Sequence, residues 1–280
     1  MVNYSTRRGL PFHSSLSKPH MMRIGILCYL LLIPLSFPVY SAQLDTQRTY
    51  RACGHPAYPP ISWVSNQTVT GVGPYLIGKT LSHFDIKISF HQESNWERCL
   101  KELEKGNIDV AVALYKTKNR ERYYDYFSSP IVKEEIMLFY NTQFPQQFNS
   151  FDDLKNKKIG ILFGDSYGDQ MDKWLSENMK IENVSNDIQN FGKLLRGRID
   201  FMPLGRYGGT LQNKKLGHSD TIKVLDRPLA TDYWYMAISK KSPLAEHMKE
   251  LDQELTRVRS NIDIGELMAT YSRQYISQPR

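Results

Sequence analysis

The chain has 280 residues and a formal net charge of +7, with 41% apolar and 12% aromatic residues. This composition supports a folded core and excludes a largely disordered chain. The first 42 residues hold four basic residues and no acid, so the remainder has 32 basic and 29 acidic residues and a net charge of +3. That balance gives little attraction for phosphate, and we expect no nucleic-acid partner.

Residues 1–41 have the features of a secretory signal peptide. Arg23 precedes an apolar run at residues 24–33, and prolines and small residues follow it. A basic residue, a short apolar core and a small-residue exit are typical of a cleaved leader, whereas a membrane-spanning helix needs about 20 apolar residues. We therefore expect export to the periplasm, with an uncleaved anchor as the alternative. A start at Met21 or Met22 would explain the residues before the leader.

Strand and helix patterns alternate from residue 48 onward. Apolar alternation predicts strands, and apolar residues three and four positions apart predict helices. We expect strands at 48–53, 86–90, 109–113 and 135–140, and helices at 74–81 and 96–105. This order is typical of a parallel sheet covered by helices.

A polar connection, residues 141–149, leads into a second series of the same kind. We expect strands at 158–162, through Pro203 and at 234–239, and helices from Ser150, at 169–177, at 188–195, at 244–259 and at 264–274. The phrase Lys105-Gly106-x-x-Asp109 recurs as Arg196-Gly197-x-x-Asp200. In both, glycine ends a helix and aspartate opens a strand. The repeat suggests two similar lobes.

Two cysteines remain once the leader is removed, Cys53 at the end of the first strand and Cys99 on the helix at 96–105. The apolar face of that helix should pack on the sheet containing the first strand, which favours a disulfide in an oxidising compartment. Two buried free thiols are the alternative. Two cysteines without paired histidines nearby cannot complete a zinc site, so we expect no metal.

Three short motifs stand in order in the middle of the chain: Gly106-x-x-Asp109, Thr117-x-x-Arg120 and Phe127-Ser128-x-Pro130. The stretch resembles the family 3 extracellular solute-binding proteins, the periplasmic receptors of polar amino-acid ABC transporters. The resemblance extends from about Thr49 to Tyr275.

This resemblance implies an α/β fold of the type II periplasmic-binding-protein class. Such a protein has two lobes, each a mixed, mostly parallel sheet flanked by helices, with a hinge between them. We expect the first lobe to comprise residues 48–135 and 236–277 and the second to comprise residues 136–235.

The loop after the strand at 109–113 holds the expected ligand anchor, Arg120. Loops beyond the carboxyl ends of strands bind ligands in open α/β sheets, and a guanidinium can grip a carboxylate with two parallel hydrogen bonds. We expect Arg120 to lie outside the core and to be unpaired until such a ligand arrives. A surface arginine is the alternative. The other expected ligand contacts are Thr117, Tyr58, Trp63, His55 and Ala113 from the first lobe, and Ser166, Asp165 and Gly164 from the second.

Three of these expectations rest on the resemblance. It implies that Tyr58 stacks on the ligand, that Ser166 supplies a hydroxyl, and that the loop at 164–168 faces the ligand's carboxylate. Ordinary alternatives are a tyrosine at the edge of a core for Tyr58 and a local side-chain turn for Ser166.

The chain also departs from the family at acidic positions. Gly205 stands where amino-acid receptors place the aspartate that holds the ligand's ammonium, and His55 stands where receptors for cationic amino acids are acidic. Asp165 and Asp232 are possible substitutes. These departures remove negative charge from the cleft. They count against a standard α-amino acid and favour a ligand with a carboxylate and no ammonium, or one held by water and aromatic rings.

The function that follows is capture of a small carboxylate-bearing ligand, an amino acid or a related compound, for ABC-type uptake. We expect a monomeric periplasmic receptor without a cofactor, which delivers its ligand to a permease in the inner membrane, and we expect no enzymatic activity. A ligand-sensing receptor and an enzyme similar to cyclohexadienyl dehydratase on the same fold are the alternatives. The sequence does not identify the ligand or the permease.

Overall fold

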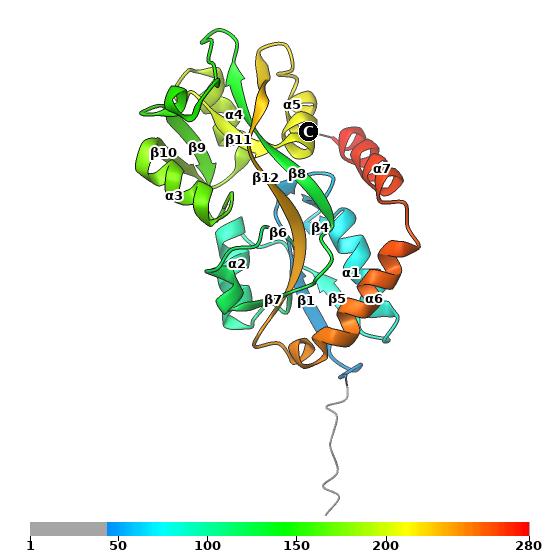
Figure 1. Ribbon diagram of the computed structural model, residues 1–280. Helices are drawn as coiled ribbons and strands as arrows, with labels where there is room; N and C mark the ends of the chain where they lie inside the picture. Colours follow the sequence, from blue (N-terminus) through cyan, green and yellow to red (C-terminus); the bar gives the residue numbers. More distant parts are fainter. Residues whose placement is uncertain (1–43, 280) are drawn as a thin grey trace, which may run out of the picture. The chain divides into compact units, whose positions relative to one another are not determined.

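The computed structural model describes residues 44–279 (Figure 1). These residues belong to one compact unit. The expected signal peptide, residues 1–41, lies outside the described residues. The type II α/β architecture is built on one seven-stranded sheet and two smaller sheets.

Parallel strands form the first part of the main sheet. β1 (Thr49–Cys53) lies between β5 (Lys87–Phe90) and β6 (Val110–Leu114) and is parallel to both. α1 (Val72–Ser82) and α2 (Trp96–Lys105) make the two crossovers. The strand–helix–strand prediction for this part of the chain is confirmed.

A small antiparallel sheet interrupts this series after β1. It consists of β2 (Ala57–Tyr58), β3 (Ser62–Ser65) and β4 (Thr68–Thr70). The sequence pattern predicted no strand in this segment. The short hairpins place Tyr58 and Trp63 in different environments, because only Tyr58 is close to the aromatic cluster described below.

Two long antiparallel strands continue the main sheet. β12 (Ile222–Ser239) pairs along its second half with β6 and with β7 (Tyr124–Tyr126), and over most of its length with β8 (Val132–Asn141). β11 (Met202–Gly205) pairs with the other edge of β8. Figure 1 shows β8 and β12 side by side as the strands that link the two strand series.

The second series begins with the 3-10 helix η2 (Phe151–Leu154) and contains the parallel pair β9 (Lys158–Leu162) and β10 (Lys180–Val184). A parallel bridge between Ile159 and Phe201 joins β9 to the segment that leads into β11. The helices of this part are α3 (Asp169–Asn178), α4 (Asp187–Leu195) and α5 (Arg206–Leu216).

The chain ends with the 3-10 helix η3 (Pro243–His247) and the helices α6 (Met248–Ser260) and α7 (Ile264–Ser277). α6 packs on α1, whereas α7 contacts both α1 and α5 (Figure 1). The division into 48–135 plus 236–277 and 136–235 remains a prediction.

The repeated Gly-x-x-Asp phrase has the same backbone geometry at both places. Gly106 ends α2 with φ 83°, and Gly197 follows α4 with φ 61°. Positive φ is the left-handed region that glycine enters without a Cβ clash.

The aspartates of the phrase also make equivalent bonds. Asp109 accepts a hydrogen bond from the backbone N–H of Arg51 in β1 at 2.9 Å, and Asp200 accepts one from the backbone N–H of Lys158 in β9 at 2.8 Å. Each aspartate therefore satisfies a backbone donor of the neighbouring strand.

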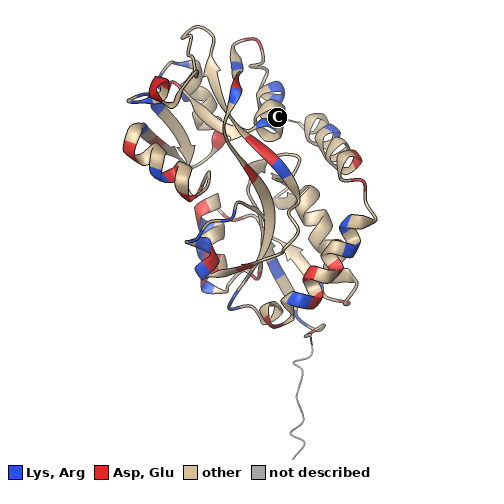
Figure 2. Ribbon diagram, in the orientation of Figure 1, with Lys and Arg blue, Asp and Glu red and all other residues tan. Residues whose placement is uncertain are grey.

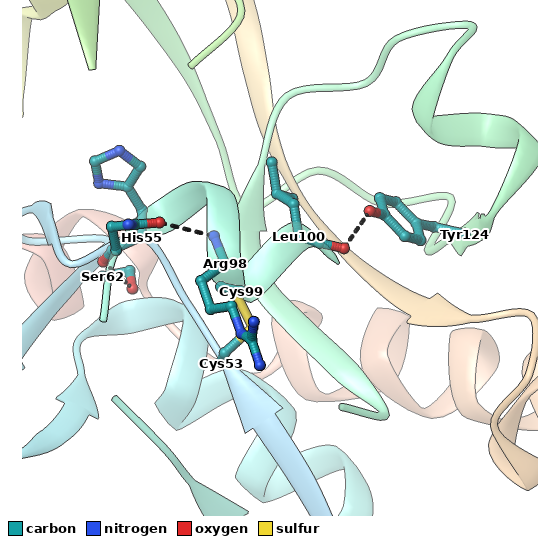
Figure 3. Close-up of a disulfide and its surroundings, with 8 residues drawn as sticks. Cys53, His55, Ser62, Arg98, Cys99, Leu100 and Tyr124 are labelled. Carbon is teal, nitrogen blue, oxygen red and sulfur yellow. Dashed lines mark hydrogen bonds between the residues drawn. A yellow bond between two sulfur atoms is a disulfide. The ribbon is translucent and has the colours of Figure 1, made fainter. Parts of the chain in front are cut away.

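The Cys53–Cys99 disulfide is present, which confirms the pairing favoured by the sequence (Figure 3). Its Cα atoms are 5.9 Å apart, within the usual range for a bridge. Both cysteines are buried, so the bond fixes α2 to the end of β1. At the residue of α2 that follows Cys99, the Tyr124 hydroxyl donates to the carbonyl oxygen of Leu100 at 2.7 Å (Figure 3).

Charges of both signs are interleaved on the helices α2 and α3 (Figure 2). Pairs such as Lys101–Glu97 at 2.8 Å stand four residues apart on the same helix face. Within residues 44–279, no helix is long and apolar enough to cross a membrane. The same residues contain no cluster of three or more His, Cys, Asp or Glu side chains that could hold a metal ion.

Candidate functional site

Arg120 begins the 3-10 helix η1 (Arg120–Arg122), in the loop that follows β6. Its guanidinium Nη1 donates to the carbonyl oxygen of Tyr115 at 2.7 Å, and its Nη2 donates to that of Gly164 at 2.8 Å. Its backbone N–H donates to the Thr117 hydroxyl at 3.2 Å. The expectation of an unpaired guanidinium outside the core is wrong: Arg120 is only 8% exposed. It bridges the loops after β6 and β9.

A cavity of about 290 Å³ adjoins Arg120. Its lining includes five of the expected ligand contacts, namely Arg120, Thr117, Gly164, Asp165 and Ser166. Four further acids line it: Glu97, Glu104, Asp169 and Asp172. The basic lining residues are Arg120 and Lys101. Because acids outnumber bases, the wall of the cavity is more favourable to a ligand that carries a cation as well as a carboxylate.

Ser166 is held by a neighbouring helix. Its hydroxyl donates to a carboxylate oxygen of Asp172 in α3, and the other oxygen accepts from the backbone N–H of Tyr167 at 2.7 Å. Burial raises the pKa of Asp172, and the bond from Ser166 opposes that rise. The hydroxyl of Ser166 is therefore oriented by Asp172, and its oxygen also accepts from the backbone N–H of Gly168 at 3.3 Å. One lone pair of this oxygen remains for a further donor.

His55 and Asp165 connect the β1–β2 loop to the β9–α3 loop. The His55 Nε2 and an oxygen of Asp165 are 3.0 Å apart, and His55 Nδ1 accepts a hydrogen bond from the backbone N–H of Ala57 at 3.2 Å. An acceptor at Nδ1 requires that Nε2 carry the proton, so the ring donates to Asp165. Both ring nitrogens are therefore engaged within the protein.

A cluster of aromatic rings surrounds this pair. The Tyr58 ring centroid lies 4.4 Å from that of His55 and 4.6 Å from that of Trp234, and Tyr115 stacks on Trp234 at 4.0 Å. The hydroxyls of Tyr58 and Tyr115 are buried without a hydrogen-bond partner among residues 44–279. Two such hydroxyls are unusual in a protein interior, and a bound ligand or water would satisfy them.

Three rings near this pair were not predicted from the sequence. The ring centroid of Trp96 lies 5.2 Å from that of His55. From the sequence, Trp96 is recognisable only as part of the apolar face of α2. Tyr115 and Trp234 had no assigned role. The position of Tyr115 directly after β6 is the signal that could have found it, because residues at the ends of strands form ligand sites. Trp234 lies inside β12, where no such local signal marks it.

Glu134 in β8 is a buried acid that the sequence analysis also missed. One of its oxygens accepts from the backbone N–H of Tyr207 at 3.1 Å, and the other accepts from the Trp234 indole at 3.4 Å. Glu134 is 1% exposed, and burial raises its pKa from 4.5 to about 7. Among residues 44–279 it has no basic partner within ion-pair distance.

The space for Glu134 depends on Gly205. A Cβ atom added at Gly205 would lie 2.8 Å from the carboxyl carbon of Glu134, closer than van der Waals contact allows. The missing side chain at Gly205 therefore leaves room for an acid supplied by a different strand.

Two further expected contacts, Trp63 and Ala113, do not line the cavity beside Arg120. The Trp63 indole donates to Gln278 at 3.0 Å and packs against Tyr275 with ring centroids 5.6 Å apart. Ala113 is fully buried inside β6. Asp232, considered as a substitute acid, is partly buried, and burial raises its pKa. The structure thus brings together Arg120, Thr117, Gly164, Asp165, Ser166, His55 and Tyr58, but not Trp63.

The sequence of residues 50–274 matches the family model of the bacterial extracellular solute-binding proteins, family 3. The chain belongs to this family. The described residues of this solute-binding protein have the mixed α/β fold that the resemblance implied.

Comparisons with individual proteins agree with this family. This solute-binding protein is 26% identical over 172 residues to the L-cystine-binding protein TcyJ of Escherichia coli strain K12. The alignment covers 60% of this chain and 62% of that protein, less than two thirds of its length.

Two solved structures share the fold. One is an amino acid ABC transporter substrate-binding protein, AbpA, from Streptococcus pneumoniae bound to L-arginine, with a TM-score of 0.70 and 16% identity, covering 83% of this chain and 98% of that one. The other is an ancestral amino acid-binding protein described as a precursor of cyclohexadienyl dehydratase, with a TM-score of 0.65 and 20% identity, covering 80% and 96%.

Proposed function

We propose that this solute-binding protein captures an amino acid or a closely related carboxylate, and that Arg120 binds the carboxylate. The position of Arg120 carries the proposal, because its guanidinium lies where the loops after β6 and β9 meet and lines the cavity there. Arginine has five N–H donors, and the bonds to Tyr115 and Gly164 use two of them. The remaining donors suit a ligand carboxylate.

Glu134 is the proposed partner of the ligand's ammonium. Among residues 44–279 it is a buried acid without a basic partner, and it accepts from the indole N–H of Trp234, whose ring packs against that of Tyr58. A cation is stabilised both by a carboxylate and by aromatic faces. An ammonium would also lower the pKa of Glu134 and so favour its charged form. This arrangement offsets the glycine at position 205 and supports an amino acid over a ligand without a nitrogen.

We propose binding rather than catalysis. The obvious acid–base group, His55, donates to Asp165 through Nε2 and accepts from Ala57 at Nδ1, so neither nitrogen is available to a substrate. General acid–base catalysis needs such a group within hydrogen-bond reach of the reacting proton. The likeness to the precursor of a dehydratase shows the fold alone.

The proposed setting is the periplasm, where a monomer would deliver its ligand to an ABC permease in the inner membrane. The relatives support this setting, because the E. coli protein binds L-cystine and the S. pneumoniae protein belongs to an amino acid ABC transporter. Ligand sensing through a membrane partner would use the same binding step. Mass spectrometry of ligand released from native protein would identify the solute.

The test is calorimetric titration of the full chain with L-cystine, L-arginine and any ligand recovered from native protein. We expect Arg120→Lys to weaken binding by about thirtyfold or more, because lysine keeps the charge but loses the planar fork. Arg120 is buried, so a thermal melt must first show that the variant is folded.

Arg122→Lys is the matched control, since Arg122 is two residues away, exposed, and hydrogen-bonded to the Asn119 side chain. Its affinity should equal that of the unmodified protein. Equal affinities for Arg120→Lys and the unmodified protein would contradict the proposal.

A further inference from the structure

A second and larger cavity, of about 570 Å³, lies apart from Arg120. It is lined by residues of β2 and β3, the end of β9, the first turn of α4, the last turns of α5 and the end of α7. It shares no lining residue with the cavity beside Arg120. Its volume falls in the range of about 300–1,000 Å³ that is usual for small-molecule sites.

Its walls are mainly apolar. Trp63, Leu162, Ile188, Leu216 and Tyr275 contribute large side chains to the lining. Ile188 is 66% exposed although it stands in the first turn of a helix. An exposed large apolar side chain at the rim of a cavity marks a surface that a ligand can cover.

Asp187, at the start of α4, is the acidic residue of the lining. It is 3% exposed, and its Oδ2 atom is buried without a hydrogen-bond partner among residues 44–279. Burial, and next the nearby charge of Asp165, raise its pKa well above the usual value. A buried carboxyl group without a partner is unfavourable, and a donor or cation removes that penalty.

Asp187 also affects the pKa of Tyr275, which lines the same cavity. Burial, and next the charge of Asp187, raise the pKa of Tyr275 near the end of α7 to about 12. Asp187 and Tyr275 therefore lie close enough to interact electrostatically across the cavity they both line.

The basic residue of the lining does not neutralise Asp187. The Lys215 ammonium donates to the carbonyl oxygen of Tyr275 at 2.9 Å and lies 4.2 Å from the centre of the Tyr275 ring. The Trp63 indole likewise donates to Gln278. Lys215 and Trp63 thus hold the end of α7 in place as one wall, and they leave the carboxyl group of Asp187 for an incoming group.

We propose that this cavity binds an apolar organic cation, such as an arylalkylamine. The cationic nitrogen pairs with Asp187, and the hydrocarbon body lies against Trp63 and Leu216. Aromatic and aliphatic walls stabilise the body by removing its surface from water, and the ammonium donates to the unpartnered oxygen of Asp187. The site is independent of the ligand proposed for Arg120.

The probe is 2-phenylethylamine, titrated into the full chain while the Trp63 indole resonance is followed by NMR. Trp63→Phe assigns that resonance, and calorimetry measures the affinity. We expect 2-phenylethylamine to bind and to shift the Trp63 signal. The anionic analogue 3-phenylpropionate and the neutral analogue 2-phenylethanol should bind at least about tenfold more weakly, because they do not provide the charge that pairs with Asp187.

Asp187→Asn should weaken the binding of 2-phenylethylamine by about tenfold or more. The substitution is nearly isosteric and changes a buried carboxyl group whose Oδ2 has no hydrogen-bond partner among residues 44–279, so the variant should remain folded. Asp169→Asn is the matched control: Asp169 also begins a helix and lines a cavity, but it is exposed and lies in the cavity beside Arg120. That variant should bind 2-phenylethylamine as the unmodified protein does.

Arg120→Lys separates this proposal from the proposed function. It should leave 2-phenylethylamine binding unchanged even if amino-acid binding is lost. No shift of the Trp63 signal, equal binding by Asp187→Asn, equal binding of 2-phenylethanol, or loss of the amine site in Arg120→Lys would each overturn the proposal.

Discussion

The two Gly-x-x-Asp units make the same backbone turn but differ in the burial of the aspartate and in the hydrogen bonds that it accepts. Asp109 is fully buried, and besides its bond to β1 it accepts from Arg48 at 2.8 Å and from the hydroxyl of Ser242 at 2.6 Å. Asp200 is half-buried, and its second bond is a long one, 3.4 Å, from Gln146. The same four-residue phrase therefore sets the same local geometry in both places. Its contribution to the free energy of unfolding depends on hydrogen bonds from distant segments.

A covalent difference adds to this contrast. The Cys53–Cys99 disulfide joins β1 to α2, the helix that Gly106 ends. The second series of strands contains no cysteine. We expect the segment around Asp109 to be the more stable of the two.

Removing the disulfide should have the largest effect. In the chain-entropy model, a bridge across 46 residues contributes about 4 kcal/mol to the free energy of unfolding. Cys53→Ser with Cys99→Ser should lose most of this, as measured by urea unfolding of oxidised protein. Unmodified protein treated with a reducing agent should approach the variant, and an unchanged urea midpoint in both would contradict the expectation.

Glu134 tests what happens when a buried acid lacks the basic partner that Asp109 has. Its pKa is raised from 4.5 to about 7, so between these pH values the unfolded chain loses the proton first. The free energy of unfolding of the ligand-free protein should therefore fall by about 3 kcal/mol as pH rises through this window and then level off.

Denaturant unfolding from pH 4 to pH 8 measures this slope. Glu134→Gln should flatten it, because glutamine does not titrate. Superimposable pH profiles for Glu134→Gln and the unmodified protein would show that another group is responsible.

Asp109→Asn should lower the free energy of unfolding by about 2 kcal/mol, since charge-assisted bonds to Arg48 and Ser242 are replaced by weaker ones in a buried site. Chemical denaturation measures the change. Arg48→Ala, which removes only the partly exposed partner, should cost less. A larger loss for Arg48→Ala than for Asp109→Asn would assign the stability to the arginine side chain instead.

Asp200→Asn should have the smallest effect, about 1 kcal/mol or less, because water reaches this site and can replace the lost bonds. Chemical denaturation of Asp200→Asn and Asp109→Asn under identical conditions measures the difference. Equal losses for the two substitutions would mean that burial does not distinguish the two units.

Local signals allowed several elements to be predicted from sequence. α2 begins and ends where its pattern predicted, because Asn95 caps it by accepting from the Arg98 N–H at 2.8 Å and Gly106 ends it. β9 also matches its predicted range, since a short apolar run between polar segments is a clear strand signal.

Elements that depend on distant partners were missed. α5 contains Gly208 and Gly209, which disfavour a helix in isolation. A Cβ at Gly209 would lie 2.5 Å from the Phe139 ring of β8, so the glycine permits close packing of helix on sheet. Only the last part of β12 was predicted, because its first half is polar and is ordered by pairing with β8.

The candidate site divides in the same way. Arg120 and Ser166 stand in recognisable motifs that follow strands, so they could be named from the sequence. Glu134 and Trp234 lie inside strands on polar or mixed runs, and nothing in the neighbouring sequence shows that both approach Gly205 and Tyr58. Glu134 and Trp234 come together because β8 and β12 pair in the sheet.

The guanidinium of Arg120 has one more consequence. Arg120 belongs to the loop after β6, and it donates to the carbonyl oxygen of Gly164, 44 residues further along the chain in the loop after β9. A fluctuation that separates either loop from the other must break this bond. The loops after β6 and β9 are therefore expected to open together, as one cooperative unit of local unfolding. A ligand held by the remaining N–H groups of Arg120 would suppress the motion of both loops at once.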